Sequence, residues 1–423
     1  MSRKGEGTLP PDSETPGPAA PPVVATGPRA LLANANFRIL WFAGGVGNSM
    51  RWLEMLVAGI FTFELTGSAL LVAVVTVSRT LPQLVMGSLI GVIGDALNRK
   101  LLLVAGFLLA SATAATLSVL AFSGAIRIWH VAIGAMLAGL VAAGEMAVRR
   151  RTIGDVVPAH AVSPAIALDS LTNSFARMLG PLVGGAVFEA TGVGGAYLIS
   201  ALLHLVAAVG LSRLEYQQER RSLSLARIPA ELAEGFAMVR RRPILLSVVL
   251  VSIITNVFGF SYSALIPPIG LDTFGVSPAL VGLLAAAEPL GAVIGGIALT
   301  MGWFGRDRPR QFIGGSFIFL VAVIAMALAP WFAIAYLAVL VGGIGTARYG
   351  ILQTSLALAD APPAVRSRVM GMVTVSIGTG PLGVLTAGAL SEAIGPAHAL
   401  IVMATLGLGA LALVRWRIPE VRT

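Results

Sequence analysis

The residues best suited to chemistry are charged side chains that interrupt long apolar segments. Arg51, Glu54, Arg79, Arg177 and Glu288 each lie well inside such a segment, at similar distances from its ends. A charge at mid-depth in a lipid bilayer is costly, so it pairs with another charge or lines a polar cavity. We therefore predict a charged site there that binds a solute or a proton. The amide side chains expected to donate hydrogen bonds at this site are Asn48, Asn173, Asn256 and Gln353.

Two features of this set bear on its chemistry. Arg51 and Glu54 are three residues apart, so they share a helix face and either pair with each other or face the site. The set also holds three arginines against two glutamates, and this spare positive charge favours an anionic or carboxylate-bearing solute.

Composition places the apolar segments in a membrane. Of the 423 residues, 56% are hydrophobic and 12% are charged, whereas a soluble domain carries roughly 25% charged residues. Cysteine is absent, which excludes disulfides and thiolate metal sites. The sequence holds no metal-ligand spacing, nucleophile elbow or phosphate-binding loop, so we expect neither an enzyme nor a cofactor or metal.

The apolar runs predict an all-α membrane protein with twelve transmembrane helices. A span needs roughly 20 mostly apolar residues, and only a helix satisfies its own backbone in lipid. The predicted spans are 37–64, 69–94, 99–122, 128–149, 163–189, 194–213, 244–270, 277–303, 311–329, 331–358, 366–391 and 396–415.

Basic residues set the predicted orientation. With the N-terminus inside, the outer loops hold Arg127 and the other loop arginines and lysines fall on the inner side. Both termini are then cytoplasmic, in the inner membrane of a bacterium. The net charge of +9 is explained by this ring of basic groups, which argues against nucleic-acid binding.

The two halves of the chain resemble each other. Ser68-Ala69-Leu70-Leu71-Val72 recurs as Ser277-Pro278-Ala279-Leu280-Val281, and Gly180-Pro181-Leu182 recurs as Gly380-Pro381-Leu382. Such repeats place a transporter's binding site between the halves, and we expect Pro181 and Pro381 to kink their helices. The predicted divisions are a disordered tail (1–30), a six-helix bundle (31–213), a linker with an amphipathic helix at Ile228–Val239 (214–243), a second six-helix bundle (244–416) and a short tail (417–423).

Two motifs carry a family resemblance. The loop after the second span, Gly91-Val-Ile-Gly-Asp95-Ala-Leu-Asn-Arg99-Lys100, is similar to a signature of the major facilitator superfamily, although Ala96 and Asn98 depart from it. Gly180-Pro181-Leu-Val-Gly184-Gly185 resembles the tail of that superfamily's antiporter motif. Four further tracts resemble the enterobactin-exporter and macrolide-efflux branch: Asn36–Trp41, Glu64–Ser68, Leu81–Gln83 and Arg366–Gly371.

The resemblance implies how the halves meet. In that fold spans 5 and 8 pack across the interface between halves, so we predict that Arg177 and Glu288 pair there. The inner ends of spans 4 and 10 converge when such a protein faces outward, which makes Glu145 and Arg348 a candidate gate. Asp95 and Arg99 are candidates for the superfamily's latch between halves. Span 6 is peripheral in this fold, so we assign His204 a structural role.

The expected function is secondary active export of a small organic molecule, such as a drug, siderophore or secondary metabolite, by alternating access in a monomer. The expected energy source is proton antiport, with Glu54 and Glu288 as candidate proton carriers. Two alternatives stay open: a proton-linked or facilitated importer of a small metabolite, and a receptor or assembly factor that does not transport.

Overall fold

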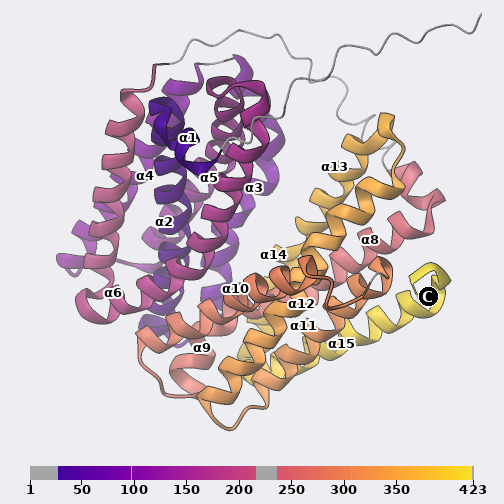
Figure 1. Ribbon diagram of the computed structural model, residues 1–423. Helices are drawn as coiled ribbons and strands as arrows, with labels where there is room; N and C mark the ends of the chain where they lie inside the picture. Colours follow the sequence, from indigo (N-terminus) through magenta and orange to yellow (C-terminus); the bar gives the residue numbers. More distant parts are fainter. Residues whose placement is uncertain (1–26, 97, 216–235, 306, 422–423) are drawn as a thin grey trace, which may run out of the picture.

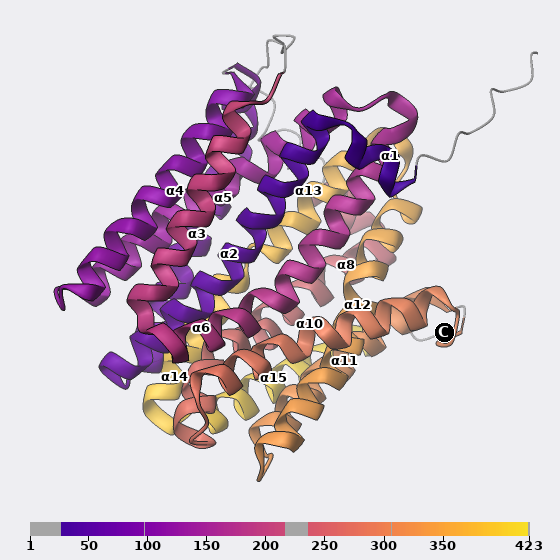
Figure 2. The same ribbon diagram turned by 60° about the vertical axis from the view of Figure 1, so that its left-hand side comes forward.

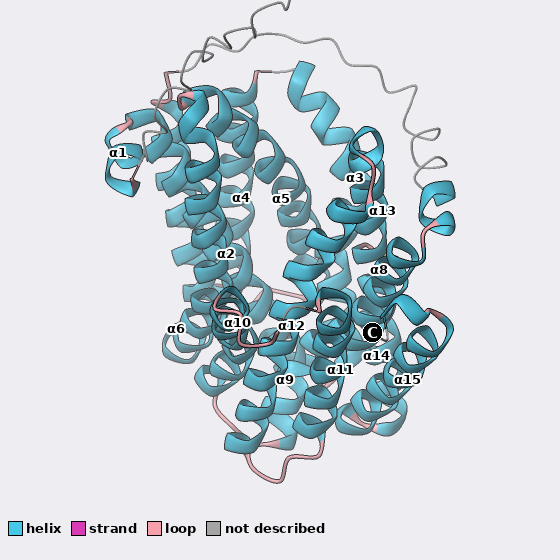
Figure 3. Ribbon diagram, turned by 45° about the vertical axis from the view of Figure 1, so that its right-hand side comes forward, coloured by secondary structure: helices cyan, strands magenta, loops and turns pink. Residues whose placement is uncertain are grey.

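The helices of the chain gather into two bundles (Figure 1). The computed structural model describes residues 27–96, 98–215, 236–305 and 307–421, with the backbone alone for residues 84–96, 364 and 421. Within these ranges every regular element is a helix, as Figure 3 shows by colour. The predicted all-α membrane class is confirmed.

The first bundle contains five long helices. One of them, α6, consists of two helical segments that meet at a sharp bend at Gly192, whose φ of 68° favours glycine, and each segment holds one predicted span. The predicted tail ends earlier than expected, since a short helix begins at Pro28, while residues 1–26 lie outside the described ranges. The elements are α1 (Pro28–Ala33), α2 (Ala35–Thr66), α3 (Ala69–Ala96), α4 (Arg99–Phe122), α5 (Ile128–Val156), η1 (Ala159–Ala161) and α6 (Val162–Ser212).

The second bundle is less regular. Its seventh predicted span changes from α-helix to a π turn at Thr255–Gly259, a 3-10 helix at Phe260–Leu265 and a second π turn at Ile269–Thr273. Its elements are α8 (Pro243–Ile254), η3 (Thr255–Gly259), η4 (Phe260–Leu265), α9 (Ile266–Pro268), η5 (Ile269–Thr273), α10 (Pro278–Thr300), α11 (Arg308–Ala327), α12 (Phe332–Asp360), η6 (Pro363–Val365), α13 (Arg366–Ile377), α14 (Gly380–Ile394), α15 (Pro396–Arg417) and η7 (Pro419–Val421).

The two matching prolines behave differently. Pro381 follows a break, because α13 ends at Ile377 and α14 begins at Gly380. Pro181 lies inside α6, where the one residue with non-helical dihedral angles is Gly192. The two halves therefore differ at the matching prolines: the second half interrupts its helix, whereas helical dihedral angles continue through Pro181, where the predicted kink stays a prediction.

Between the bundles, most of the linker lies outside the described ranges. The described part resumes at Phe236, and residues 236–241 are helical. The amphipathic helix predicted at Ile228–Val239 therefore stays a prediction for most of its length.

Hydropathy and exposure both fit a lipid surrounding. In the described ranges nine helices are long and apolar enough to cross a membrane, and one of them, Ala159–Ser212, includes the bend at Gly192. Large apolar side chains also face outward, with Leu101 and Val119 each 67% exposed. Length and composition thus identify nine candidate spans in the described ranges, and the predicted total of twelve stays a prediction.

The bundles meet at one end and separate at the other (Figures 1 and 2). We call the end that holds Leu214 and Phe236 the linker end and the opposite one, with the turns at Gly67, Gly124 and Gly395, the far end. The most extensive contacts between the bundles are those of α6 with α10 and of α3 with α14. Their closest approaches lie toward the far end, where a methyl group on Gly388 would come within 2.5 Å of Ala73.

Candidate functional site

An ion pair joins the two bundles. Arg177 of α6 donates a hydrogen bond through Nη2 to Oε2 of Glu288 on α10, as predicted. The hydroxyl of Thr346 on α12 donates to the other oxygen, Oε1, of the same carboxylate. Glu288 is only 2% exposed, whereas the Arg177 side chain is 33% exposed. The carboxylate is thus fixed from two sides, and its arginine partner remains accessible.

A cavity between the bundles contains this pair. Most of its wall is apolar, with rings and prolines from both halves, and Arg177 and Glu288 are its charged residues. The Arg177 guanidinium also lies 5.7 Å from the centroid of the Trp52 ring, close enough for a cation–π contact. Apolar walls around a few fixed polar groups are typical of small-molecule sites. The other large wall residues are Met55, Phe260, Tyr262, Pro267 and Pro289.

A second buried carboxylate lies inside the first bundle. Glu54 on α2 accepts a hydrogen bond from Nη1 of Arg79 at 3.0 Å and another from the hydroxyl of Ser200 on α6. His204 Nδ1 is 4.0 Å from Glu54 Oε1 and 3.0 Å from the Ser200 carbonyl oxygen. The span that carries His204 was expected to be peripheral, yet the imidazole is buried beside this carboxylate. Its assigned structural role remains a prediction.

Of the two alternatives for Arg51 and Glu54, pairing with each other is excluded. Arg51 instead lies 3.8 Å from Glu145 on α5, while Glu54 turns toward α3 and α6. Sequence spacing placed both side chains on one helix face but did not show which neighbours that face meets. A small cavity within the first bundle is lined by both groups, together with Arg79, Glu145, Tyr197 and His204.

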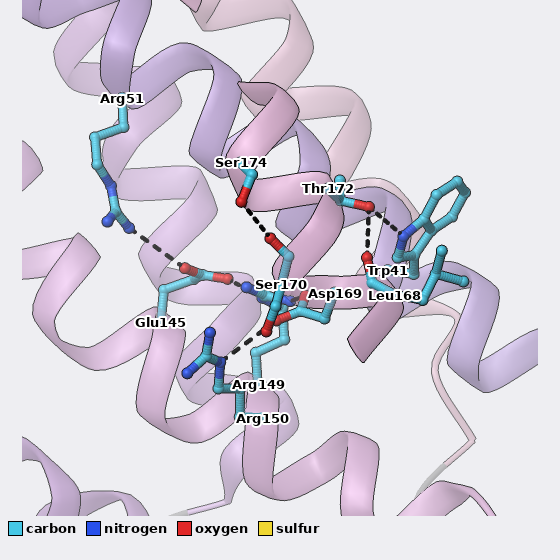
Figure 4. Close-up of polar contacts among 10 residues, drawn as sticks. All are labelled: Trp41, Arg51, Glu145, Arg149, Arg150, Leu168, Asp169, Ser170, Thr172 and Ser174. Atoms are coloured by element: carbon cyan, nitrogen blue, oxygen red, sulfur yellow. Dashed lines mark hydrogen bonds and ion pairs between the residues drawn. The ribbon is translucent and has the colours of Figure 1, made fainter. Parts of the chain in front are cut away.

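Glu145 belongs to a chain of charges nearer the linker end (Figure 4). It accepts a hydrogen bond from Arg149, one turn along α5, and Arg149 also bonds to Asp169 on α6. Arg150 extends the chain, with Nε 3.4 Å from Asp169. Arg149 is 1% exposed, and a methyl group on Gly44 would come within 2.3 Å of its guanidinium. Gly44 therefore leaves the space that this buried arginine fills.

These contacts change the balance of positive and negative charges that the sequence predicted for the site. Among the described side chains of the first bundle, each buried arginine has a carboxylate partner, and Arg177 has Glu288. The spare positive charge on which an anionic solute was predicted is not found, because Arg51 is paired and Asp169 was overlooked. The pairs within the first bundle include Arg51 with Glu145, Arg79 with Glu54, Arg99 with Asp155, and Arg149 with Glu145 and Asp169.

Glu145 and Arg348 do not contact each other in this conformation, in which the linker ends of the bundles are apart; their gate is predicted for the outward-facing state and stays a prediction. The Arg348 guanidinium lies 4.8 Å from the ring centroid of Phe304, within the second bundle. Its side chain also packs beside Gly314 and Gly315 of α11. Arg348 thus packs against its own bundle in this conformation, and Glu145 forms ion pairs with Arg51 and Arg149.

The predicted latch residues are described in part. Arg99 donates to Asp155 at 2.6 Å, a contact inside the first bundle. The side chain of Asp95 lies outside the described part of the chain, so its contact with the second half stays a prediction.

The antiporter-like motif serves two interfaces. A methyl group on Gly180 would meet Trp52 Cβ at 2.6 Å, and one on Gly184 would come within 3.2 Å of Leu53, so both glycines fit α6 against α2. Gly185 faces the other bundle, where a methyl group would lie 2.3 Å from the Pro278 carbonyl oxygen. Small residues at this spacing let helices approach closely in lipid.

The predicted amides have different surroundings. Asn256 and Gln353 both donate to the Tyr349 hydroxyl, at 3.1 and 2.9 Å, and form a polar cluster inside the second bundle. Asn48 is 2% exposed, and its side-chain oxygen has no hydrogen-bond partner among the described residues. None of the three lines the cavity between the bundles.

Comparison with known proteins decides the family. The profile of a major facilitator family described as transmembrane secretion effector matches residues 26–423. The chain belongs to this family. The chain is similar to macrolide efflux protein A of Streptococcus pyogenes, with 22% identity over 91% of this chain and 96% of the relative. The multidrug efflux pump Tap of Mycolicibacterium fortuitum is 27% identical, with 84% and 89% covered.

Solved structures confirm the fold of this secretion effector family member. A bacterial homologue of the human lysosomal transporter Spinster, in an inward-facing and unoccupied conformation, superposes with a TM-score of 0.68 at 16% identity, over 91% of this chain and 96% of that one. A POT family transporter in complex with 5-aminolevulinic acid gives a TM-score of 0.70 at 13% identity, over 92% and 96%. The chain is therefore a multi-pass membrane protein with the major facilitator fold.

Proposed function

We propose that this chain exports an amphipathic organic molecule from a bacterial cell by alternating access, in exchange for protons. The observation that carries the proposal is the Arg177–Glu288 pair, which joins the two bundles inside a mainly apolar cavity. The efflux relatives support the direction of transport. The apolar wall supports a drug-like solute rather than a sugar or an amino acid, which would need many polar partners.

The conformation supports a cycle that starts from the cytoplasm. If the linker end is cytoplasmic, as the distribution of arginines favours, the bundles separate toward the cytoplasm and close toward the outside. A solute then reaches the cavity from inside the cell. Rocking of the bundles exposes the same cavity to the outside.

Glu288 is our proposed site of proton exchange. Its carboxylate attracts Arg177 only while ionised, and a proton on Glu288 therefore removes the charge that joins α6 to α10. A solute that binds next to Glu288 and a proton that binds on it then compete for one group. Glu54 is enclosed within the first bundle and does not line this cavity, so direct competition there is less favoured.

The test is an accumulation assay in bacteria that lack their main efflux pumps. Cells that express the chain should retain less of a labelled apolar drug, and a protonophore should abolish the difference. Glu288→Gln should lose pH-driven transport and still bind the drug. Unchanged retention across a panel of drugs and siderophores would exclude export, and increased retention would instead identify an importer.

A further inference from the structure

Two glutamates bridge the bundles at the far end. Glu189 of α6 accepts a hydrogen bond through Oε2 from the backbone N–H of Ala279, at 2.9 Å. Glu392 of α14 accepts one through Oε1 from the backbone N–H of Leu70, at 3.1 Å. Ala279 and Leu70 lie in the first turns of α10 and α3. Each carboxylate therefore caps a helix that belongs to the other bundle.

A serine supports each cap. The Ser68 hydroxyl donates to Glu392 Oε1 at 2.6 Å, and the Ser277 side chain hydrogen-bonds to Glu189. Ser68 and Ser277 are separated by 209 positions, and so are Leu70 and Ala279. The same shift relates the repeated tracts that open spans 2 and 8. The two capped helix starts are therefore equivalent across the internal repeat, although the two acids are 203 positions apart and the Gly-Pro-Leu tracts of their helices are 200 apart.

The physical basis is the free N–H groups at a helix start. The first turn of a helix has backbone donors without partners inside the helix, and it carries partial positive charge. A carboxylate there is attracted to both, but these acids lie on the neighbouring bundle. The contacts consequently exist only while the far ends of the bundles are together. When the far end opens, water takes the place of each carboxylate.

We propose that Glu189 and Glu392 form a twofold latch that holds the outer side of the transporter closed and sets the balance between its two states. Both carboxylates are exposed at the surface, so they do not hold either bundle together. The latch rests on the proposed alternating access, because it has a role only if the far end opens. Its residues lie outside the cavity, so it affects the rate of the cycle without contacting the solute.

The sequence has no cysteine, so spin labels can be attached at introduced cysteines without first removing native ones. Spin labels at Ser123→Cys and Leu328→Cys, in far-end loops of different bundles, would report the distance across the far end by pulsed electron paramagnetic resonance. We expect Glu189→Ala or Glu392→Ala to raise the ratio of open to closed far ends about two- to fivefold. The double variant should raise it by about the product of the two. Glu189→Gln keeps an acceptor oxygen but loses the charge, and should give an intermediate shift.

Glu64→Ala is the matched control. Glu64 is an exposed glutamate near the far end of α2, with no bond to the second bundle among the described contacts, and its loss should leave the ratio unchanged. A double variant with the wild-type ratio overturns the latch. A wild-type protein whose far end opens normally, but which moves no solute, overturns the proposed function and leaves the latch intact.

Discussion

Arg177 and Glu288 are 111 positions apart in the sequence and bond to each other from helices of different bundles. The contact spans the surface along which a major facilitator protein must move. It also lies in the cavity wall, so one ion pair is connected both to the solute and to the arrangement of the bundles.

The first prediction concerns this pair. Arg177→Glu or Glu288→Arg alone places like charges together in a buried site and should reduce drug efflux about tenfold or more. The combined exchange restores opposite charges and should recover much of the activity. Arg417→Ala, which removes an exposed arginine that contacts its neighbour Trp416, is the control and should retain efflux. If the combined variant shows as little drug efflux as either single variant, the ion pair between the two residues is not what efflux requires.

The second prediction concerns the close approach of α6 and α10. Gly185→Ala adds a methyl group 2.3 Å from the Pro278 carbonyl oxygen, and such overpacking typically costs about 1–3 kcal/mol. This overpacking raises the free energy of the state in which the far end is closed. The spin-label measurement should therefore show a larger population with the far end open. Gly210→Ala is the control, because a methyl group there has nothing within 4 Å. Equal distance distributions for Gly185→Ala and Gly210→Ala would show that the close approach of α6 and α10 at Gly185 does not control closure of the far end.

The third prediction concerns the charges nearer the linker end. Asp169→Ala leaves the buried Arg149 with Glu145 as its remaining described partner, and breaking such a buried pair costs about 3–5 kcal/mol. The free energy of unfolding in detergent should fall by about that amount. Asp272→Ala, at an exposed aspartate without a described ion pair, should change it little. A normal stability for Asp169→Ala would mean that water reaches Arg149.

The fourth prediction separates the two candidate proton carriers. Purified protein in weak buffer should release protons when the drug binds, if drug and proton compete at Glu288. Glu288→Gln should abolish this release, and Glu54→Gln should preserve it because Glu54 lies in a different cavity. The opposite pattern would move proton exchange into the first bundle, beside Arg79 and His204.

Much of the fold could be predicted from the sequence, because a long apolar segment in lipid must satisfy its own backbone hydrogen bonds and therefore forms a helix. Each predicted span overlaps a described helix, and the bend at Gly192 occurs in the short gap between two of them. The break before Pro381 and the continuity through Pro181 could not be predicted, since both sites share the letters Gly-Pro-Leu. Packing around each proline decides between a break and a continuous helix.

The candidate site was predicted in part. Arg177 and Glu288 were paired correctly because the resemblance supplied the contact between spans 5 and 8. For Arg51 and Glu54 the sequence leaves pairing open, because helix spacing gives the face of a residue and not its neighbours. Asp169 was missed, although an aspartate within a predicted span carries the same signal as the glutamates that were chosen.

The seventh span has a consequence for how far the bundles must move. Its six residues Phe260–Leu265 form a 3-10 helix, which rises about 2.0 Å per residue, whereas an α-helix rises about 1.5 Å. Rewinding them as α-helix would shorten the span by about 3 Å. Phe260 and Tyr262 in this segment face the cavity, and Pro267 just beyond it packs against Gly59 of α2. A change of helix type in this span would therefore move the cavity wall and the contact with α2 together, while the other helices of each bundle keep their length.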